Sequence, residues 1–185
     1  MEVFSRIFSG PAGCKGQPDR LMIDAPHLKV HRTAASLPRK EAVPCRIGRT
    51  KGGLNSKLHA ACDSQGRPLV LLLPESQMNG HKGAVLMLPS LQPAKALLGD
   101  KGYDSDQLRQ ALIDRDIEPC IFSKRNRKQP IRYDKALHHR RHRIETMSER
   151  LRVWRCVAMR YDRCADTFFS PISLACSVLF WINES

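Results

Sequence analysis

The feature that most constrains the fold is an acidic turn, residues 99–106, that directly follows a short apolar run, residues 94–98. A helical pattern follows at about residues 107–112. This order predicts a buried strand that ends at Asp100, a sharp turn that Gly102 permits, and then a helix. Ligand and metal sites of α/β folds gather at the carboxyl ends of strands. Taken alone, the stretch also fits an ordinary strand-to-helix turn with an aspartate near the helix start.

A second aspartate lies in an apolar stretch closer to the start of the chain. Residues 21–30 predict a strand that Pro26 interrupts. Alternation along it predicts two faces, one with Leu21 and Ile23 and one with Met22 and Asp24. An unpaired buried carboxylate is costly, so Asp24 needs a partner. A metal ion is one such partner, and an arginine or a backbone cap is the alternative.

The longest helical pattern, about residues 135–161, carries a third acidic candidate. Its apolar stripe, which we expect to face the core, consists of Ile144, Met147, Leu151, Trp154 and Ala158. A second stripe, rotated by about 130° from the first, consists of His138, Arg141, Glu145 and Arg152. One carboxylate among basic residues is also typical of an ion-pair face on a surface helix.

The remaining sequence predicts a mixture of strands, helices and basic loops. Residues 54–63 and 67–73 are apolar-rich runs on either side of turn residues and predict a hairpin. Residues 168–182 predict a buried C-terminal helix, because the run is short for a membrane span and contains Pro171. We further expect a basic loop at 31–53, a helix at 80–91, a short strand at 117–122 and a second basic loop at 124–130.

The charge balance points to a polyanionic partner. The chain has 185 residues, with 31 Lys and Arg against 18 Asp and Glu, a formal net charge of +13. Nucleic acid is the first expectation, whereas a membrane would call for a basic amphipathic helix or a lipidation signal, neither of which is evident. Seven cysteines without a CxxC pair disfavour a structural zinc site and favour a reduced, cytoplasmic protein.

The three carboxylates come from an early strand, the end of a later strand and a late helix, and this combination suits two-metal phosphoryl transfer. Two hard cations about 4 Å apart need several oxygen ligands, which aspartate and glutamate supply. One ion activates a water or a 3′-hydroxyl, and the other stabilises the leaving oxygen. The protein then contributes position and charge rather than a covalent intermediate.

Several motifs, in this order, resemble bacterial insertion-sequence DDE transposases, more closely those of the insertion-sequence-five family. The resemblance runs from about residue 17 to the C-terminus. It implies an α/β fold of the RNase H-like type, a mixed sheet flanked by helices, and metal-dependent DNA strand cleavage and strand transfer with two Mg²⁺ or Mn²⁺ ions. The motifs are Met22–Lys29, Gly48–His59, Gly99–Tyr103, Arg141–Glu145, Leu151–Arg155 and Arg160–Arg163.

The resemblance also assigns roles to residues. Asp24, Asp100 and Glu145 match the three catalytic, metal-binding carboxylates of the family. Arg141 matches the arginine of the Tyr-Arg-Glu-Lys helix signature, a phosphate contact. His138 stands where that signature has tyrosine and Arg152 where it has lysine. With Lys101, which follows the second aspartate, these make up the expected DNA-binding residues: His138, Arg141, Arg152 and Lys101.

Other departures from the family pattern leave two alternative functions open. Pro26 replaces a small hydroxyl residue, and Ser148 and Glu149 stand where an aromatic residue and a glycine are commoner. The alternatives are a catalytically inactive DNA-binding transposase remnant and a metal-dependent nuclease of the same fold.

The partners and the domain organisation follow from the same resemblance. Double-stranded DNA at the element ends and target is the expected partner, bound by a homo-oligomer and without a membrane. We expect a short N-terminal segment at 1–20 and one catalytic domain at 21–185. Because about 20 residues precede Asp24, we expect the chain to be a second reading frame, with an upstream-frame product supplying an N-terminal domain.

Overall fold

The structure is a computed structural model that describes residues 18–36, 44–74, 78–127, 129, 131 and 133–182. Its strands are β1 (Arg20–Asp24), β2 (His27–Val30), β3 (Gly48–Thr50), β4 (Gly53–Lys57), β5 (His59–Cys62), β6 (Pro68–Leu72), β7 (Ala96–Gly99), β8 (Glu118–Ile121) and β9 (Met159–Arg160). Its α-helices are α2 (Arg32–Ser36), α3 (Gly80–Met87), α4 (Asp106–Ile113), α5 (Lys135–His139), α6 (His142–Arg152), α7 (Arg155–Ala158) and α8 (Ala165–Ser177). Single turns of other helix types are η1 (Leu88–Ser90), η2 (Lys101–Tyr103) and η3 (Val178–Ile182).

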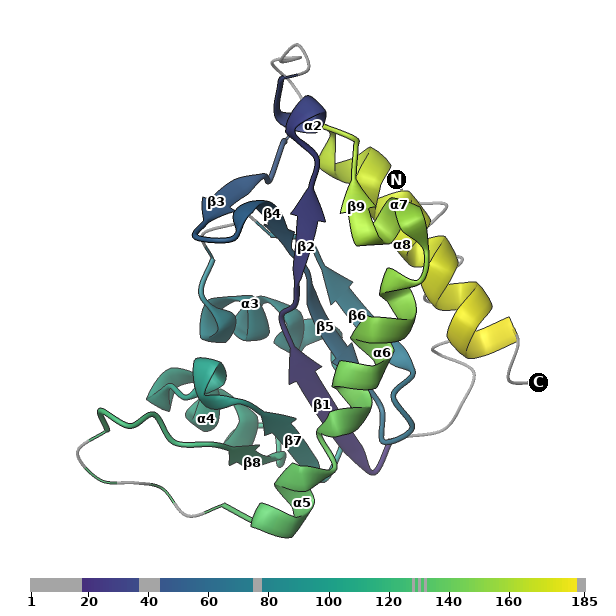
Figure 1. Cartoon of the computed structure of the whole chain (residues 1–185). Helices are drawn as coiled ribbons and strands as arrows, with labels where there is room; N and C mark the ends of the chain where they lie inside the picture. Colours follow the sequence, from purple (N-terminus) through teal and green to yellow (C-terminus); the bar gives the residue numbers. More distant parts are fainter. Residues whose placement is uncertain are drawn as a thin grey trace.

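The described strands form two sheets (Figure 1). The larger has the order β6-β5-β1-β7-β8, and the smaller has the order β3-β4-β2-β9. In the larger sheet β1 pairs antiparallel with β5 and parallel with β7. The sheet is therefore mixed, as the family resemblance implies.

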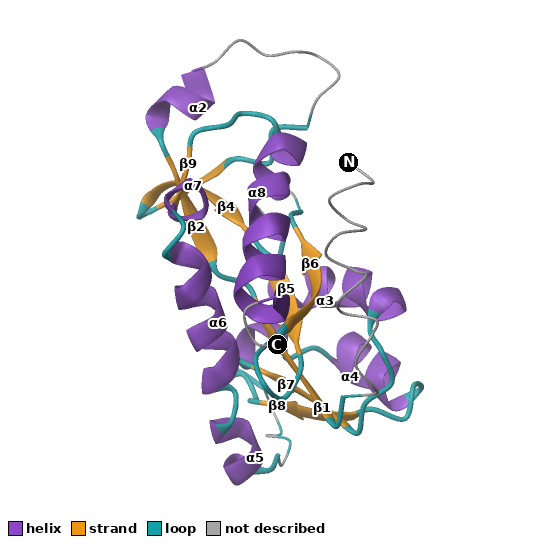
Figure 2. Cartoon of the chain, turned by 90° about the vertical axis from the view of Figure 1, so that its right-hand side faces the viewer, coloured by secondary structure: helices purple, strands orange, loops and turns teal. Residues whose placement is uncertain are grey.

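Strand β1 supplies both faces of the larger sheet with core residues. Leu21 and Ile23 are fully buried in one cluster, and Met22 is buried in the other. This confirms the predicted alternation. Helices α6 and α8 cover the Met22 face, and α3 and α4 cover the opposite face (Figure 2).

The predicted helix at 135–161 is wrong as a single element. The chain bends after α5, and a second break separates α6 from α7 at Val153 and Trp154. Residues 159–160 then leave the helical path as β9 and pair in parallel with β2. Hydrogen bonds to a strand far away in the sequence replace the helical ones. The helical spacing of apolar residues therefore ends before residue 161. Ile144, Met147 and Leu151 face the core as predicted, whereas Trp154 and Ala158 are only half buried.

The predicted strand at 54–63 is also two strands, one in each sheet. It breaks at Leu58, whose N–H donates to the carbonyl of Pro26 at 3.0 Å. Pro26 likewise separates β1, in the larger sheet, from β2, in the smaller sheet. The two sheets therefore diverge where Pro26 and Leu58 lie side by side. The β5–β6 hairpin itself is confirmed.

The predicted loop at 31–53 contains regular structure. Helix α2 begins it, and β3 pairs antiparallel with β4. Residues 37–43 lie outside the described part of the chain, as do residues 1–17, so the boundary near residue 20 stays a prediction. The helix at 80–91 is found as α3 with η1, and the strand at 117–122 is found as β8.

Helix α8 and η3 together form the only described segment, residues 165–182, that is long and apolar enough to cross a membrane. Half of the segment is buried inside the molecule. Three of its residues, Phe168, Ile172 and Cys176, are fully buried in the hydrophobic core. The predicted buried C-terminal helix is therefore found, with Pro171 inside it.

A fully buried arginine, Arg160, holds the smaller sheet against the C-terminal part of the chain. Its guanidinium also lies over the ring of Phe168, 4.9 Å from the centroid. Burial lowers the pKa of Arg160 to about 10, so the group stays charged at neutral pH. It donates to four oxygens at 2.5–2.7 Å: Ser56 Oγ and the carbonyls of Cys45, Asp162 and Arg163.

A buried aspartate, Asp104, anchors the second basic loop. Its carboxylate accepts hydrogen bonds from Arg109 Nε at 2.9 Å, Arg127 Nε at 3.0 Å and the backbone N–H of Lys124 at 2.8 Å. Burial alone would raise the pKa of Asp104, but these donors outweigh burial and lower it to about 2. The loop is thus tied to the start of α4 by one ionised side chain.

Asp104→Asn is expected to lower the free energy of unfolding at pH 7 by about 3 kcal/mol, because two arginines lose their carboxylate. The folded-state pKa lies below the unfolded value, so this stabilisation is complete above about pH 4 and is lost as the pH falls toward 2. Urea unfolding of both proteins at several pH values measures the difference. The exposed Asp114→Asn is the matched control, and an equal loss in both variants would contradict the anchoring role.

Gly83→Ala in α3 is expected to destabilise the protein by about 1–3 kcal/mol, although alanine favours helices. An added Cβ would lie 2.2 Å from Cε1 of the fully buried His59. In a His59→Ala background the same change should be tolerated, because the ring is gone. A thermal-unfolding double-mutant cycle measures this, and additive effects would refute the close contact.

Candidate functional site

The carboxyl ends of β1 and β7 bring two aspartates together. The parallel register pairs Met22 with Leu98, so two residues further on Asp24 comes level with Asp100. Asp100 follows β7 directly, and its Oδ1 accepts a hydrogen bond from the N–H of Gly102 at 2.9 Å. A Cβ at Gly102 would lie 3.0 Å from that oxygen, which explains the glycine. The predicted strand, turn and aspartate are all found.

The glutamate reaches the same place from α6 through an arginine. Glu145 lies in the first turn of α6 and is 54% exposed. Arg141 Nη2 contacts its Oε1 at 2.5 Å, and Arg141 Nη1 contacts Asp24 Oδ1 at 3.4 Å. The guanidinium, only 15% exposed, thus lies between two of the three carboxylates.

Burial dominates the electrostatics of Asp24. It raises the pKa of Asp24, which the guanidinium of Arg141 opposes and the charges of Asp100 and Glu145 reinforce. Beneath the carboxylates the pKa of the buried Tyr103 is raised, first by burial and then by Asp24 and Asp100. A cation beside Asp24 therefore stabilises this arrangement, and in this structure the cation is Arg141.

The donor chemistry of the site suits a hard divalent cation only in part. Asp24 and Asp100 are adjacent carboxylates on neighbouring strands, the ligand type that Mg²⁺ prefers. Glu145, however, is paired with Arg141. Within the described ranges, no three Asp, Glu, His or Cys side chains converge on one metal position. Of the partners that the sequence left open for Asp24, the structure shows the arginine together with a backbone hydrogen bond from Ala25.

The four residues expected to contact DNA lie in different surroundings. Lys101 is exposed directly beside Asp100. His138 turns inward, with Nε2 at 3.2 Å from the carbonyl of Gly99 and its ring against Phe122 and Tyr133.

The other two of these four residues lie on α6 or at its start. Arg141 is engaged between the carboxylates. Arg152 is exposed in the last turn of α6, roughly 10 Å along the axis from Glu145.

Lys57 is a site residue that the sequence reasoning missed. Burial lowers its pKa, while the charges of Asp100 and Asp24 act in the opposite direction. Its Nζ donates to the carbonyl of Met78 at 3.1 Å. Lys57 belongs to the motif Gly48–His59, but that motif does not reveal how the strand pairs. The pairing of Lys57 with His27 in the smaller sheet is what determines its position.

Two further buried side chains, His59 and Tyr103, lie near Lys57 and the two aspartates. Their rings pack edge to face, with 6.5 Å between the ring centroids. Burial lowers the pKa of His59 to about 4, so its ring is neutral. Neither ring nitrogen of His59 nor the hydroxyl of Tyr103 has a hydrogen-bond partner in the described part of the chain.

Comparison with known sequences gives consistent relatives. The family model described as "Transposase DDE domain" matches residues 15–177. A transposase assigned to insertion sequence element IS402 of Burkholderia cepacia is 29% identical over 155 residues, covering 74% of this chain and 71% of the relative. One assigned to IS6501 of Brucella ovis is 28% identical over 132 residues, covering 70% of this chain and 100% of the relative.

Comparison with solved structures supports the fold. A piggyBac transposase synaptic complex with hairpin DNA matches with a TM-score of 0.61 at 10% identity, over 91% of this chain. A simian T-cell lymphotropic virus intasome matches with a TM-score of 0.51 at 13% identity, over 89% of this chain. The chain spans 48% and 50% of those two chains. The predicted RNase H-like fold is confirmed.

Arg141→Gln is expected to raise the pKa of Asp24 further, because burial and the neighbouring Asp100 are then opposed only by the backbone hydrogen bond of Ala25. A carbon-13 NMR titration of the Asp24 carboxyl measures this in metal-free protein. Arg152→Gln removes the same charge from the far end of α6 and should leave the pKa of Asp24 unchanged. An unchanged Asp24 pKa in Arg141→Gln would show that the ion pair does not act in solution.

Proposed function

The chain belongs to the transposase DDE domain family, and on that premise we propose that it carries the catalytic centre of an insertion-sequence transposase. The reaction is metal-dependent cleavage of DNA strands and transfer of a strand end to target DNA. The observation that carries the proposal is the parallel register of β1 and β7, which sets Asp24 and Asp100 side by side, with Glu145 linked to Asp24 through Arg141.

The three carboxylates Asp24, Asp100 and Glu145 are the proposed ligands of two Mg²⁺ or Mn²⁺ ions. When bound, such ions activate the attacking oxygen and stabilise the charge on the leaving oxygen. Asp24, half enclosed and next to a second aspartate, is costly to keep ionised without a cation. Arg141 supplies that cation in the metal-free protein and has to release Glu145 before the glutamate can serve as a ligand.

Arg141 is then free to meet the substrate. Its planar guanidinium matches the oxygens of a phosphate, so we assign it to the backbone near the scissile bond. Lys101 follows Asp100 directly, and the charges of Asp24 and Asp100 act on Lys57, so both lysines add positive charge near the carboxylates. Arg152 is assigned to DNA further along α6. His138 acts through its bond to Gly99, which fixes the end of β7 next to Asp100.

The finer features of the proposal rest on the family resemblance. They are membership of the insertion-sequence-five family, a homo-oligomer on paired DNA ends, a cytoplasmic site of action and an upstream-frame product that supplies an N-terminal domain. The net charge of +13 supports a DNA partner. The proposed catalytic domain is 21–185.

Asp100→Asn is expected to abolish metal-dependent cutting and joining, by about 100-fold or more, because metal-based charge stabilisation contributes several kcal/mol. The assay uses labelled duplex carrying an element end with Mg²⁺ or Mn²⁺, and it scores cleaved and joined products separately. Asp114→Asn is the control, since it removes an exposed carboxylate of α4 and leaves the site intact.

Each outcome of this assay selects a function. Products that Asp100→Asn loses and Asp114→Asn keeps support the transposase. Cleavage without any joining would favour a nuclease of the same fold. No products from the unchanged chain, even with an N-terminal domain supplied, would overturn the proposal and leave a DNA-binding remnant.

A further inference from the structure

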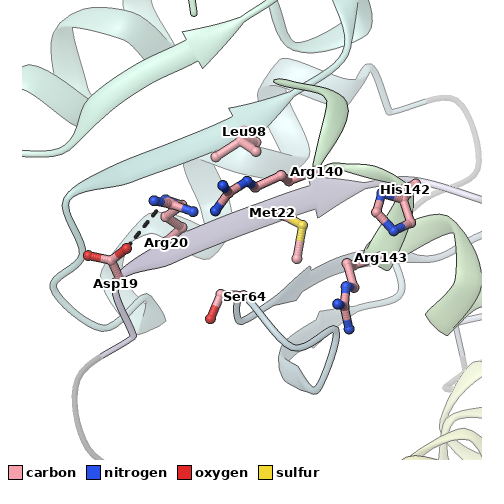
Figure 3. Close-up of a pocket in the computed structure, with 8 residues that line it drawn as sticks. All are labelled: Asp19, Arg20, Met22, Ser64, Leu98, Arg140, His142 and Arg143. Carbon is pink, nitrogen blue, oxygen red and sulfur yellow. Dashed lines mark ion pairs between the residues drawn. The ribbon is translucent and has the colours of Figure 1, made fainter. Parts of the chain in front are cut away.

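A cavity of about 340 Å³ lies beside β1, at the opposite end of the strand from Asp24 (Figure 3). It is bounded by β1, β7, the turn after β5 and the start of α6. Its lining is mostly basic and polar, and its two apolar residues, Met22 and Leu98, are almost completely buried. The lining residues are Asp19, Arg20, Met22, Ser64, Leu98, Arg140, His142 and Arg143.

The cavity carries an excess of positive charge. Three arginines line it against one carboxylate, Asp19. That carboxylate is already engaged, with Arg20 at 3.3 Å and Lys95 at 2.8 Å. Among the described residues, the guanidinium groups of Arg140 and Arg143 have no hydrogen-bond or ion-pair partner. Arg140 also acts electrostatically on Asp19, and Figure 3 shows it extended toward Arg20 while Arg143 points away from both. The cavity therefore keeps a net positive charge, with its single carboxylate shared among several cations.

The bend between α5 and α6 directs neighbouring arginines to two different places. Arg141 turns to Asp24 and Glu145, whereas Arg140 and Arg143 line the cavity. The turn after β5 packs closely against this bend, since a Cβ at Gly66 would lie 3.1 Å from the carbonyl oxygen of Arg143. The backbone that carries these arginines is thus held in place.

The cavity and the carboxylates share one face of β1. Met22 lines the cavity and precedes Asp24 by two residues on the same face, and Arg20 precedes it by four. At roughly 3.3 Å per strand residue, the cavity begins about 7 Å from Asp24 and extends to about 13 Å. A DNA strand that passes the carboxylates would bring neighbouring backbone phosphates into this range.

We propose that this cavity binds a backbone phosphate of the DNA strand whose scissile phosphate meets Asp24 and Asp100. The inference rests on the proposed function and adds a second anchoring point to it. A guanidinium group can bind two phosphate oxygens at once, and the cavity offers three such groups, from Arg20, Arg140 and Arg143. With phosphate held at both Arg141 and the cavity, the strand has one register against the carboxylates.

The first test measures DNA binding without divalent metal, so that no strand is cut. Fluorescence anisotropy with an element-end duplex is recorded from 50 to 300 mM salt for the unchanged chain and for Arg140→Gln/Arg143→Gln. Loss of one phosphate contact should reduce the slope of log affinity against log salt by about one. Lys82→Gln/Arg155→Gln removes two exposed charges outside the cavity and serves as the control.

The second test locates the phosphate. Duplexes carrying one neutral methylphosphonate at successive positions are bound to the unchanged chain and to the arginine variant. The unchanged chain should lose affinity at one or two positions close to the cleavage site, and the variant should be insensitive there. Inorganic phosphate at millimolar concentration, added as competitor, shows whether the cavity also takes the free anion.

The outcomes separate this inference from the proposed function. A cavity variant that matches the control in both slope and methylphosphonate pattern overturns the inference and leaves the transposase assignment intact. Failure of the unchanged chain to bind duplex DNA overturns both. Circular dichroism verifies that the variant is folded; if it is not, Arg143→Lys, which keeps the charge, should retain the slope and lose only the paired contact.

Discussion

Strand β1 is the constraint on which the rest of the structure depends. It has a strand on either side, and its alternate residues enter both hydrophobic clusters, so its position fixes the helices on each face of the larger sheet. Its last residue, Asp24, is held in place by the same strand pairing. Asp24 lies level with Asp100 because β1 and β7 are parallel. A carboxylate so placed has a fixed position, because a shift of register would turn Leu21 and Ile23 out of their core.

Holding Asp24 at this partly buried position makes its ionised form unfavourable, and the guanidinium of Arg141 opposes that effect. Asp24 is partly desolvated beside two other acidic groups, and Arg141 lies where it contacts both Asp24 and Glu145. In this structure the site is therefore compensated by a side chain of the protein itself.

Local patterns predicted much of the fold. Alternation gave both faces of β1, and the apolar run before Asp100 gave the end of β7. Errors arose where a distant partner decided the outcome: β9 leaves the helical pattern because β2 offers it an edge, and Leu58 breaks a strand at the divergence of two sheets. In the site, the three carboxylates could be predicted from sequence motifs. The ion pairs of Arg141 and the position of Lys57 depend on tertiary structure, which no local pattern encodes.

The buried Arg160 links residues very far apart in the chain. Its bonds to Cys45 and Ser56 span 115 and 104 residues, and the strand that contains it pairs with β2. During synthesis, the early strands β2 and β4 emerge from the ribosome long before these contacts exist. The smaller sheet is completed only when nearly the whole chain is available, so a prematurely terminated product would have basic surface without a finished fold. The fold around Arg160 can thus form only after the chain has been synthesised at least as far as Arg163.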